Sequence, residues 1–324
     1  MINKLNLLRY NEFIWLSLIL IAITSLFLIT LAMNHSEAED SVRYIYEVTK
    51  VPSTLSLYDP NHILFNSFNR VVYDLWLFLG YKGNAELPMQ INNVIAGIVT
   101  LFLVYLIARR LEMSVYFSLL CLGMVSMSYG FWRYSVEAET YILPLPFILL
   151  SAHRLMIIAE SRFEYRHFFL LGLFMAMATL FHQQHVLLIF IAPFAIIFLH
   201  SKIPLKFPKH QISGRVILFF CVSGGIIAAV YFPVAIFLAE QSELGEIIKW
   251  SQGKAVGNVF LLPTLSGGWW ATKTRCPPYK NHLSPYKGCP ALSEWPTGPT
   301  SISIRRFIAK ASGDLPCAMG SSLP

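Results

Sequence analysis

An uncharged apolar run of 21 residues, Phe13 to Met33, limits what this chain can fold into more than any other feature. A helix of that length spans the hydrocarbon core of a bilayer, which is roughly 30 Å thick. The run is longer and more apolar than the core of a secretory signal peptide, and no A-x-A-like cleavage site follows it. We therefore expect a retained membrane anchor, not a removed signal.

Further apolar runs predict an all-α protein, a polytopic bundle of transmembrane helices. Hydrophobic residues make up 55% of the 324-residue chain and charged residues 13%, which is typical of multi-span membrane proteins and not of soluble domains. The first long loop also contains a mixed segment, 63–80, which is expected to lie on the membrane surface as an interfacial helix, with Arg70 and Asp74 sharing one face. The seven expected spans are residues 13–33, 91–108, 113–132, 141–159, two short spans that divide 168–199, and 216–239.

The charge distribution gives these spans an orientation. Across the seven spans, the basic residues of the N-terminal leader and the short loops all fall on one side, which the positive-inside rule makes cytoplasmic. The N-terminus is then cytoplasmic, and the long first loop emerges on the far side. The net charge of +7 reflects these loops and a basic C-terminal fifth, so it does not indicate a nucleic-acid partner. The residues on the cytoplasmic side are Lys4, Arg9, Arg109, Arg110, Arg162, Arg166, Lys202, Lys206, Lys209 and Arg215.

The character of the chain changes near residue 259. We expect a transmembrane domain over residues 1–258 and an irregular tail over 259–324, which contains Pro, Gly and Cys but no apolar run of spanning length. Two interpretations of the tail fit. It is either a disordered or loosely folded far-side segment, or the product of a lost reading frame that truncated a larger protein.

Three polar groups meet on the far side and are the candidates for a functional site. The acidic pair Glu39 and Asp40 follows the first span, the segment WRYSVEAETY (132–141) precedes the fourth, and His182 and His185 are three residues apart between two short spans. A carboxylate beside a membrane can act as general base on a hydroxyl or amide acceptor. A nearby Arg or His can stabilise a departing phosphate. Together these groups suit the transfer of a sugar from a lipid-linked phosphate donor.

The same segments resemble a known family. An acidic pair after the first span, followed by Trp132, Ala138, Glu139 and Tyr141 before a later span, is similar to the GT-C superfamily of membrane glycosyltransferases, and in particular to its protein O-mannosyltransferase-like branch. The His-containing break between two short helices resembles that branch as well. The resemblance covers roughly residues 10 to 250.

The resemblance implies a periplasmic or lumenal active site, a polyisoprenyl-phosphate sugar donor and a protein or glycan acceptor. It also implies a loop-one acid as catalytic base, for which Asp40 is the first choice and Glu39 the second. The chain departs from the branch at residues 59–62, where DPNH stands in the region that often reads H-P-P-G-Y-P, and the branch's later spans are missing. The cofactor is unknown and a divalent metal ion stays open. The substrate-binding candidates are His62, Arg133, Glu139, Tyr141, His182 and His185, with His62 or Arg133 as the phosphate contact.

Each candidate also has a structural interpretation. Glu139 could cap the fourth span, because acids favour helix N-termini, and Glu137 is expected to be solvated. Arg133 beside Trp132 is typical of anchoring at the membrane interface. The histidines could ligate a metal, but no third ligand is fixed by spacing, so hydrogen-bonded interfacial histidines are the alternative.

The whole chain has an alternative interpretation too. It could be a non-catalytic polytopic protein: a transporter, a lipid-handling subunit or an inactive truncated relative. A transporter would carry ionisable residues near mid-membrane and broken helices or repeats. Nearly all the ionisable residues here lie at span ends, and no repeat is visible, which favours an enzyme. The short basic turns favour a bacterial inner membrane.

Overall fold

The computed structural model describes residues 10–31, 39–160, 164–202, 209–241 and 243–251. These residues form helices and connecting turns, with no strand among them, so the prediction of an all-α fold is confirmed. The predicted tail, 259–324, lies outside the described residues.

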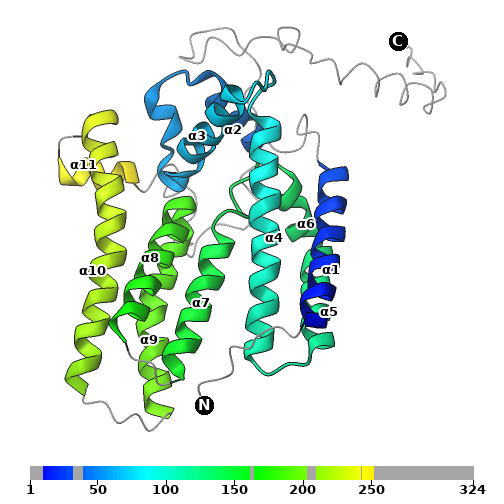
Figure 1. Cartoon of the computed structure of the whole chain (residues 1–324). Helices are drawn as coiled ribbons and strands as arrows, with labels where there is room; N and C mark the ends of the chain where they lie inside the picture. Colours follow the sequence, from blue (N-terminus) through cyan, green and yellow to red (C-terminus); the bar gives the residue numbers. More distant parts are fainter. Residues whose placement is uncertain (1–9, 32–38, 161–163, 203–208, 242, 252–324) are drawn as a thin grey trace, which may run out of the picture. The chain divides into compact units, whose positions relative to one another are not determined.

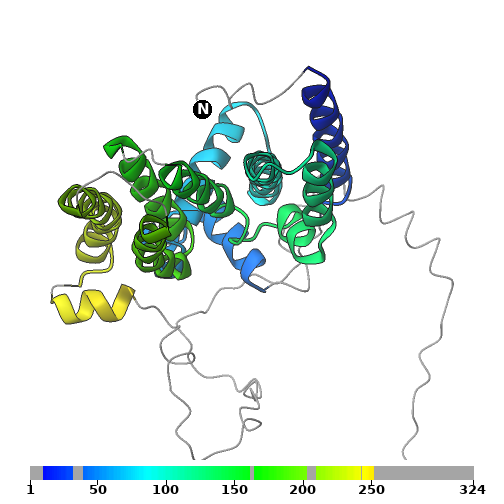
Figure 2. The same ribbon diagram turned by 90° about the horizontal axis from the view of Figure 1, so that it is seen from below.

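Figure 1 shows the long helices standing side by side, with α2 and α3 across one end of the bundle, and Figure 2 shows the same bundle from below. The α-helices are α1 (Tyr10–Ile29), α2 (Glu39–Lys50), α3 (Phe65–Phe78), α4 (Glu86–Arg110), α5 (Val115–Met127), α6 (Tyr129–Val136), α7 (Leu145–Ala159), α8 (Tyr165–Phe181), α9 (Val186–Lys202), α10 (Lys209–Pro233) and α11 (Leu244–Ser251). The short elements are the 3-10 turns η1 (Thr54–Leu57), η2 (Pro60–His62) and η3 (Gln183–His185), and the π-helical turn η4 (Val234–Leu238).

Three of the described helices are long and apolar enough to cross a membrane: α1 from Asn11, α4, and α10 continued through η4. The pair α5 and α6, bent by 64°, makes a fourth if it counts as one span. Helices α7, α8 and α9 are apolar but shorter. Each predicted span therefore corresponds to a helix or a helix pair, while the count of seven stays a prediction.

The predicted third span is not straight. Ser128 has an extended backbone (φ −66°, ψ 133°), which ends α5 and starts α6 in a new direction. Only the start of the polar segment, 133–136, is therefore carried on α6, which lies at 64° to α5. Sequence hydropathy alone did not predict this bend, because α5 and α6 together read as one continuous apolar run.

The predicted fourth span begins later than Tyr141. Helix α7 starts at Leu145, next to Pro144 and with Pro146 in its first turn. Proline is tolerated in a first turn because it has no N–H to donate to an earlier carbonyl. Residues 137–144 are consequently non-helical, and Glu139 is not the cap of this helix, which corrects that interpretation.

Helix α3 confirms the predicted helix in the first loop. Arg70 pairs with Asp74 at 2.6 Å, as expected, and Arg70 Nη1 also donates to the carbonyl of Val48 at 2.9 Å, which ties α3 to α2. An apolar stripe stays exposed on its outer face, as a helix on a membrane surface requires. The stripe consists of Phe68, Val71, Leu75 and Phe78.

The first loop is fastened over the ends of the long helices. The backbone N–H of Leu64 donates to the carbonyl of Leu180 at 3.0 Å, and the hydroxyl of Tyr231 donates to the carbonyl of Pro60 at 2.6 Å. Beneath these bonds lies a buried apolar cluster that joins α2, α3, α4, the 137–144 segment and the end of α8. Its members include Tyr44, Val48, Phe65, Met89, Ala138, Ile142 and Phe181.

Candidate active site

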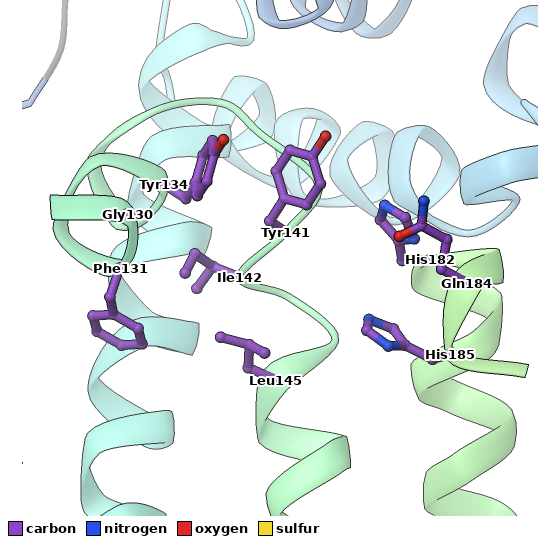
Figure 3. Close-up of a pocket in the computed structure, with 9 residues that line it drawn as sticks. All are labelled: Gly130, Phe131, Tyr134, Tyr141, Ile142, Leu145, His182, Gln184 and His185. Carbon is purple, nitrogen blue, oxygen red and sulfur yellow. The ribbon is translucent and has the colours of Figure 1, made fainter. Parts of the chain in front are cut away.

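A hollow of about 330 Å³ opens at the end of the bundle where α2 and α3 lie. It lies between α6, the start of α7 and the turn between α8 and α9, as Figure 3 shows. Apolar side chains form its inner part, while Tyr134, Tyr141 and the histidines bring polar atoms to it. Its lining residues are Gly130, Phe131, Tyr134, Tyr141, Ile142, Leu145, His182, Gln184 and His185.

The candidate histidines meet beside this hollow. The rings of His62 and His182 lie 4.7 Å apart, although 120 positions separate them in the sequence. The ring of His182 also lies 5.4 Å from that of His185 and 5.4 Å from that of Tyr141. Nδ1 of His62 and Nδ1 of His182 are both buried without a hydrogen-bond partner. Buried polar atoms are normally satisfied, so these two nitrogens are available to a bound molecule.

His182 is a neutral imidazole at physiological pH. Burial, and then the neighbouring rings of His62 and His185, lower the pKa of His182 to about 4. Burial also lowers the pKa of His62 and that of His185. These rings can therefore offer or accept hydrogen bonds near neutral pH but carry little positive charge. Within the described residues, no group of three or more His, Cys, Asp and Glu side chains has an arrangement suited to a metal ion.

The lowered pKa predicts a pH effect on stability. In the unfolded chain His182 takes up a proton near pH 6.5, whereas in the folded protein it does so only near pH 4. The unfolded state therefore binds more protons between pH 4 and 6.5. The part of the stability that depends on His182 is fully present above pH 6.5 and is lost as the pH drops toward 4. Thermal unfolding of detergent-solubilised protein should show a shallower loss over this window for His182→Gln than for the wild type. Parallel curves would contradict the lowered pKa.

Asp40 lies in the first turn of α2 and is exposed. Its carboxylate is close enough to act electrostatically on Tyr44, His62, Glu139 and Tyr141. Among the residues that the structure describes, it has no hydrogen-bond or ion-pair partner. The candidate base is thus placed at the histidine and tyrosine cluster with its oxygens available. Glu39 begins the same helix, but its side chain is not among those described.

Glu139 is buried in the non-helical 137–144 segment. Its Oε1 accepts a hydrogen bond of 2.6 Å from the hydroxyl of Ser41, the residue that follows Asp40. Burial, and to a lesser degree the negative charge of Asp40, raise the pKa of Glu139 above its ordinary value. The two acids predicted from sequence are therefore brought together, one exposed and one buried.

Arg133 and Glu137 form a pair of their own. Arg133 Nε lies 3.0 Å from Glu137 Oε1, and Arg133 Nη1 donates to the hydroxyl of Tyr129 at 2.7 Å. Glu137 is only 6% exposed, so the expectation that it is solvated is wrong. Its carbonyl accepts a hydrogen bond from buried Asn93 of α4, which holds this residue against the bundle. The guanidinium of Arg133 is engaged by these partners and does not line the hollow.

Asn93 is a residue that the sequence analysis did not identify. It is buried on α4, and its Nδ2 donates to the carbonyls of Glu137 and Glu139 at 2.6 and 2.7 Å. One side-chain amide thus holds the backbone on both sides of Ala138. An amide within an otherwise apolar span was the available signal, because buried polar groups in membrane helices usually have a partner.

Replacing Asn93 with Ala should loosen the 137–144 segment. The substitution leaves two buried carbonyls without a donor, at an expected cost of about 1–3 kcal/mol in the free energy of unfolding. Asn92→Ala is the matched control, because Asn92 Nδ2 bonds to Asn69 on α3 and not to this segment. Hydrogen exchange of residues 137–144 should rise in Asn93→Ala only. Equal protection in both variants would show that Asn93 does not hold the segment.

Comparison with known proteins adds a family to this geometry. Residues 71–227 match the family described as dolichyl-phosphate-mannose-protein mannosyltransferase. The predicted resemblance to the GT-C O-mannosyltransferase-like branch is thereby confirmed, and this is a family of glycosyltransferases, as the enzyme interpretation expects. No curated protein and no solved structure matches the chain.

The residues that match the family include only part of the candidate active site. Glu139, Tyr141, His182 and His185 fall within residues 71–227, together with the other residues that line the hollow. Asp40 and His62 precede the match, and their place in the site is given by the packing of the first loop alone.

Proposed function

We propose that this chain is an integral membrane glycosyltransferase that moves a sugar, of the mannosyl type, from a polyisoprenyl-phosphate donor to a hydroxyl or amide of a protein or glycan acceptor. One observation carries the proposal. The exposed carboxylate of Asp40, which has no partner among the described residues, acts electrostatically on Tyr141 of the hollow and on His62, whose Nδ1 is buried without a partner, as is Nδ1 of His182 in the hollow. The glycosyltransferase family match, which covers all the residues that line the hollow, supports it.

In this proposal Asp40 is the general base. It accepts the proton of the acceptor hydroxyl as that oxygen forms a bond to the anomeric carbon of the sugar. The bond between the anomeric carbon and the phosphate oxygen breaks, and the lipid phosphate leaves with the electron pair. A positioned base of this kind contributes about 10²- to 10⁴-fold to a rate. Asp40 suits the role better than Glu139, whose buried oxygen is already bonded to Ser41.

The histidines and tyrosines would bind the donor. Because burial keeps the imidazoles neutral, we infer that His62 and His182 contact the phosphate through N–H donors and not through charge. Of the two phosphate-contact candidates, His62 and Arg133, this proposal takes His62, since the guanidinium of Arg133 already has partners. The rings of Tyr134 and Tyr141, 4.6 Å apart, offer an apolar face to a sugar at the mouth of the hollow.

The site end of the bundle would face the periplasm. The acids of the site lie at one end, whereas Arg109 and Arg110 lie at the other end of α4. By the positive-inside rule the arginine end is cytoplasmic, and so is the N-terminus, because Glu12 at the start of α1 lies 3.5 Å from Arg109. We propose the bacterial inner membrane as the location.

Turnover tests the function directly. Purified chain in proteoliposomes is given a polyisoprenyl-phosphate mannose with labelled sugar, and release of the free lipid phosphate is followed by mass spectrometry. Release that needs an acceptor and is lost in Asp40→Asn supports the proposal. No release from any sugar of this donor class, by protein shown to be folded, would contradict it.

A further inference from the structure

A second cluster of charged residues lies at the opposite end of the bundle from the hollow. It is formed by the last turn of α4, the last two turns of α7 and the first turn of α8. The guanidinium of Arg110 has hydrogen-bond and ion-pair partners there. Its Nη2 and Nε bond to the two carboxylate oxygens of Glu160 at 2.7 and 3.1 Å, and its Nη1 lies 3.2 Å from Nε2 of His153, which must accept because arginine only donates.

Arg154, the residue of α7 that follows His153, has no such partner among the described residues. Its Nε is buried without a hydrogen-bond partner, and no described residue forms an ion pair with it. The charges that act on it come from Arg110 and Arg166, both positive. The acids nearby are already used, since Glu160 holds Arg110 and Glu164 holds Arg166 at 2.7 Å. A partly buried cation among like charges is costly unless an anion compensates it.

The position of Arg154 indicates what that anion is. Arg154 precedes the end of α7 by five residues, so its Cα lies about 7.5 Å inside the helix end at roughly 1.5 Å per residue. A long arginine side chain reaches from that depth to the level of the lipid headgroups. A guanidinium matches the geometry of a phosphate by donating two parallel hydrogen bonds.

We propose that Arg154 is the centre of a binding site for the phosphate of an anionic membrane lipid, at the end of the bundle remote from the candidate active site. The lipid phosphate supplies the negative charge that the protein does not, while Arg110, held by Glu160, adds to the positive field around it. The site is independent of the proposed transferase activity, because it shares no residue with the hollow.

Lipid binding by the full chain tests this site. The protein is placed in phosphatidylcholine nanodiscs with increasing phosphatidylglycerol, and both lipid retention in native mass spectrometry and the unfolding temperature are measured. A lipid that binds only the folded protein raises that temperature. We expect phosphatidylglycerol to raise the unfolding temperature of the wild type. Arg154→Gln should bind phosphatidylglycerol at least about tenfold more weakly than the wild type, as for the loss of a charge-assisted bond.

Arg166→Gln is the matched control, because it removes the same charge from the same end but from an exposed side chain with its own partner. It should keep most of the effect. If both variants lose the effect equally, only a diffuse positive field acts and the site is wrong. An unchanged phosphatidylglycerol effect in Arg154→Gln also overturns it. If Arg154→Gln does not fold, Arg154→Lys replaces it. A wild type that is equally stable in both lipids would also overturn the site.

Inorganic phosphate in phosphatidylcholine nanodiscs separates the two sources of the anion. Protection by phosphatidylglycerol but not by free phosphate supports a lipid headgroup. Equal protection by free phosphate, lost in Arg154→Gln, would overturn the lipid as the occupant and assign the site to a soluble phosphate.

Discussion

Asp40→Asn should lower sugar transfer by about 10²- to 10⁴-fold while the protein remains inserted and folded. Asparagine keeps the size of the side chain and removes the base. Asp40 is exposed and has no partner among the described residues, so the loss of its charge breaks no bond that holds the fold. Initial rates at saturating donor, with the unfolding temperature measured on the same preparation, separate the loss of chemistry from a loss of structure.

Asp74→Asn is the matched control for this substitution. Asp74 is also an exposed aspartate in the first loop, but it pairs with Arg70 on α3 and lies outside the site. Its rate should stay near that of the wild type. Activity retained in Asp40→Asn would remove Asp40 from the mechanism, and Glu39, beside it at the start of α2, would become the next candidate.

Glu139→Ala is expected to give the second large effect, on both stability and rate. The substitution leaves the buried hydroxyl of Ser41 without its acceptor, at a cost of about 1–3 kcal/mol in the free energy of unfolding. Because Ser41 follows Asp40, the first turn of α2 would also lose the bond that fixes the base beside the hollow. A fall in rate of about tenfold or more, smaller than in Asp40→Asn, is the expected result.

Glu139→Gln separates the hydrogen bond from the charge. Glutamine keeps an oxygen that can accept from Ser41 and resembles the protonated acid, which is the form that burial favours by raising the pKa of Glu139. The wild type loses that part of its stability as the pH rises through the raised pKa, and the glutamine variant does not. Glu139→Gln should therefore be at least as stable as the wild type above neutral pH.

Coupling between Glu139 and Ser41 completes the test. If the two residues act through one bond, the combined effect of Ser41→Ala and Glu139→Ala should be well below the sum of their separate effects. Strict additivity in both stability and rate would show that the bond does not position α2. A loss of rate in Glu139→Gln as large as that in Glu139→Ala would instead indicate that the charge of Glu139 takes part in the reaction.

Local patterns in the sequence predicted the helices well. Each apolar run became a helix or, over 113–132, a bent pair of helices, and the break around His182 and His185 became a turn between two short helices, as expected. The Arg70–Asp74 pair was predictable because residues four apart on a helix are neighbours. These features depend on residues close together in the chain, where period and spacing are informative.

Features that depend on contacts between distant segments were not predictable in the same way. The bend at Ser128 brings α6 into contact with α4 and α1, and Glu137 is buried beside α4, where Asn93 donates to its carbonyl. The meeting of His62 with His182 depends on the first loop being fastened over α8 and α10. Single-sequence spacing contains no information about such contacts.

The candidate site shows the same division. The acids and histidines were identifiable as residue types, and they do gather at one end of the bundle. Their supports, Ser41 and Asn93, were missed because a serine in a loop and an asparagine in a helix are common. The local partners of Arg133, Glu137 and Tyr129, were also not predicted, and they favour His62 over Arg133 as the phosphate contact.

Photo-crosslinking of a donor analogue tests most directly whether the hollow is the active site. A polyisoprenyl phosphate with a diazirine near its phosphate is irradiated with the membrane-embedded chain, and the labelled peptides are identified by mass spectrometry. The account predicts labels on the segments that carry Tyr134, Tyr141 and His182 to His185, reduced by unlabelled donor. Competed labels confined to the opposite end of the bundle, around Arg110 and Arg154, would contradict it.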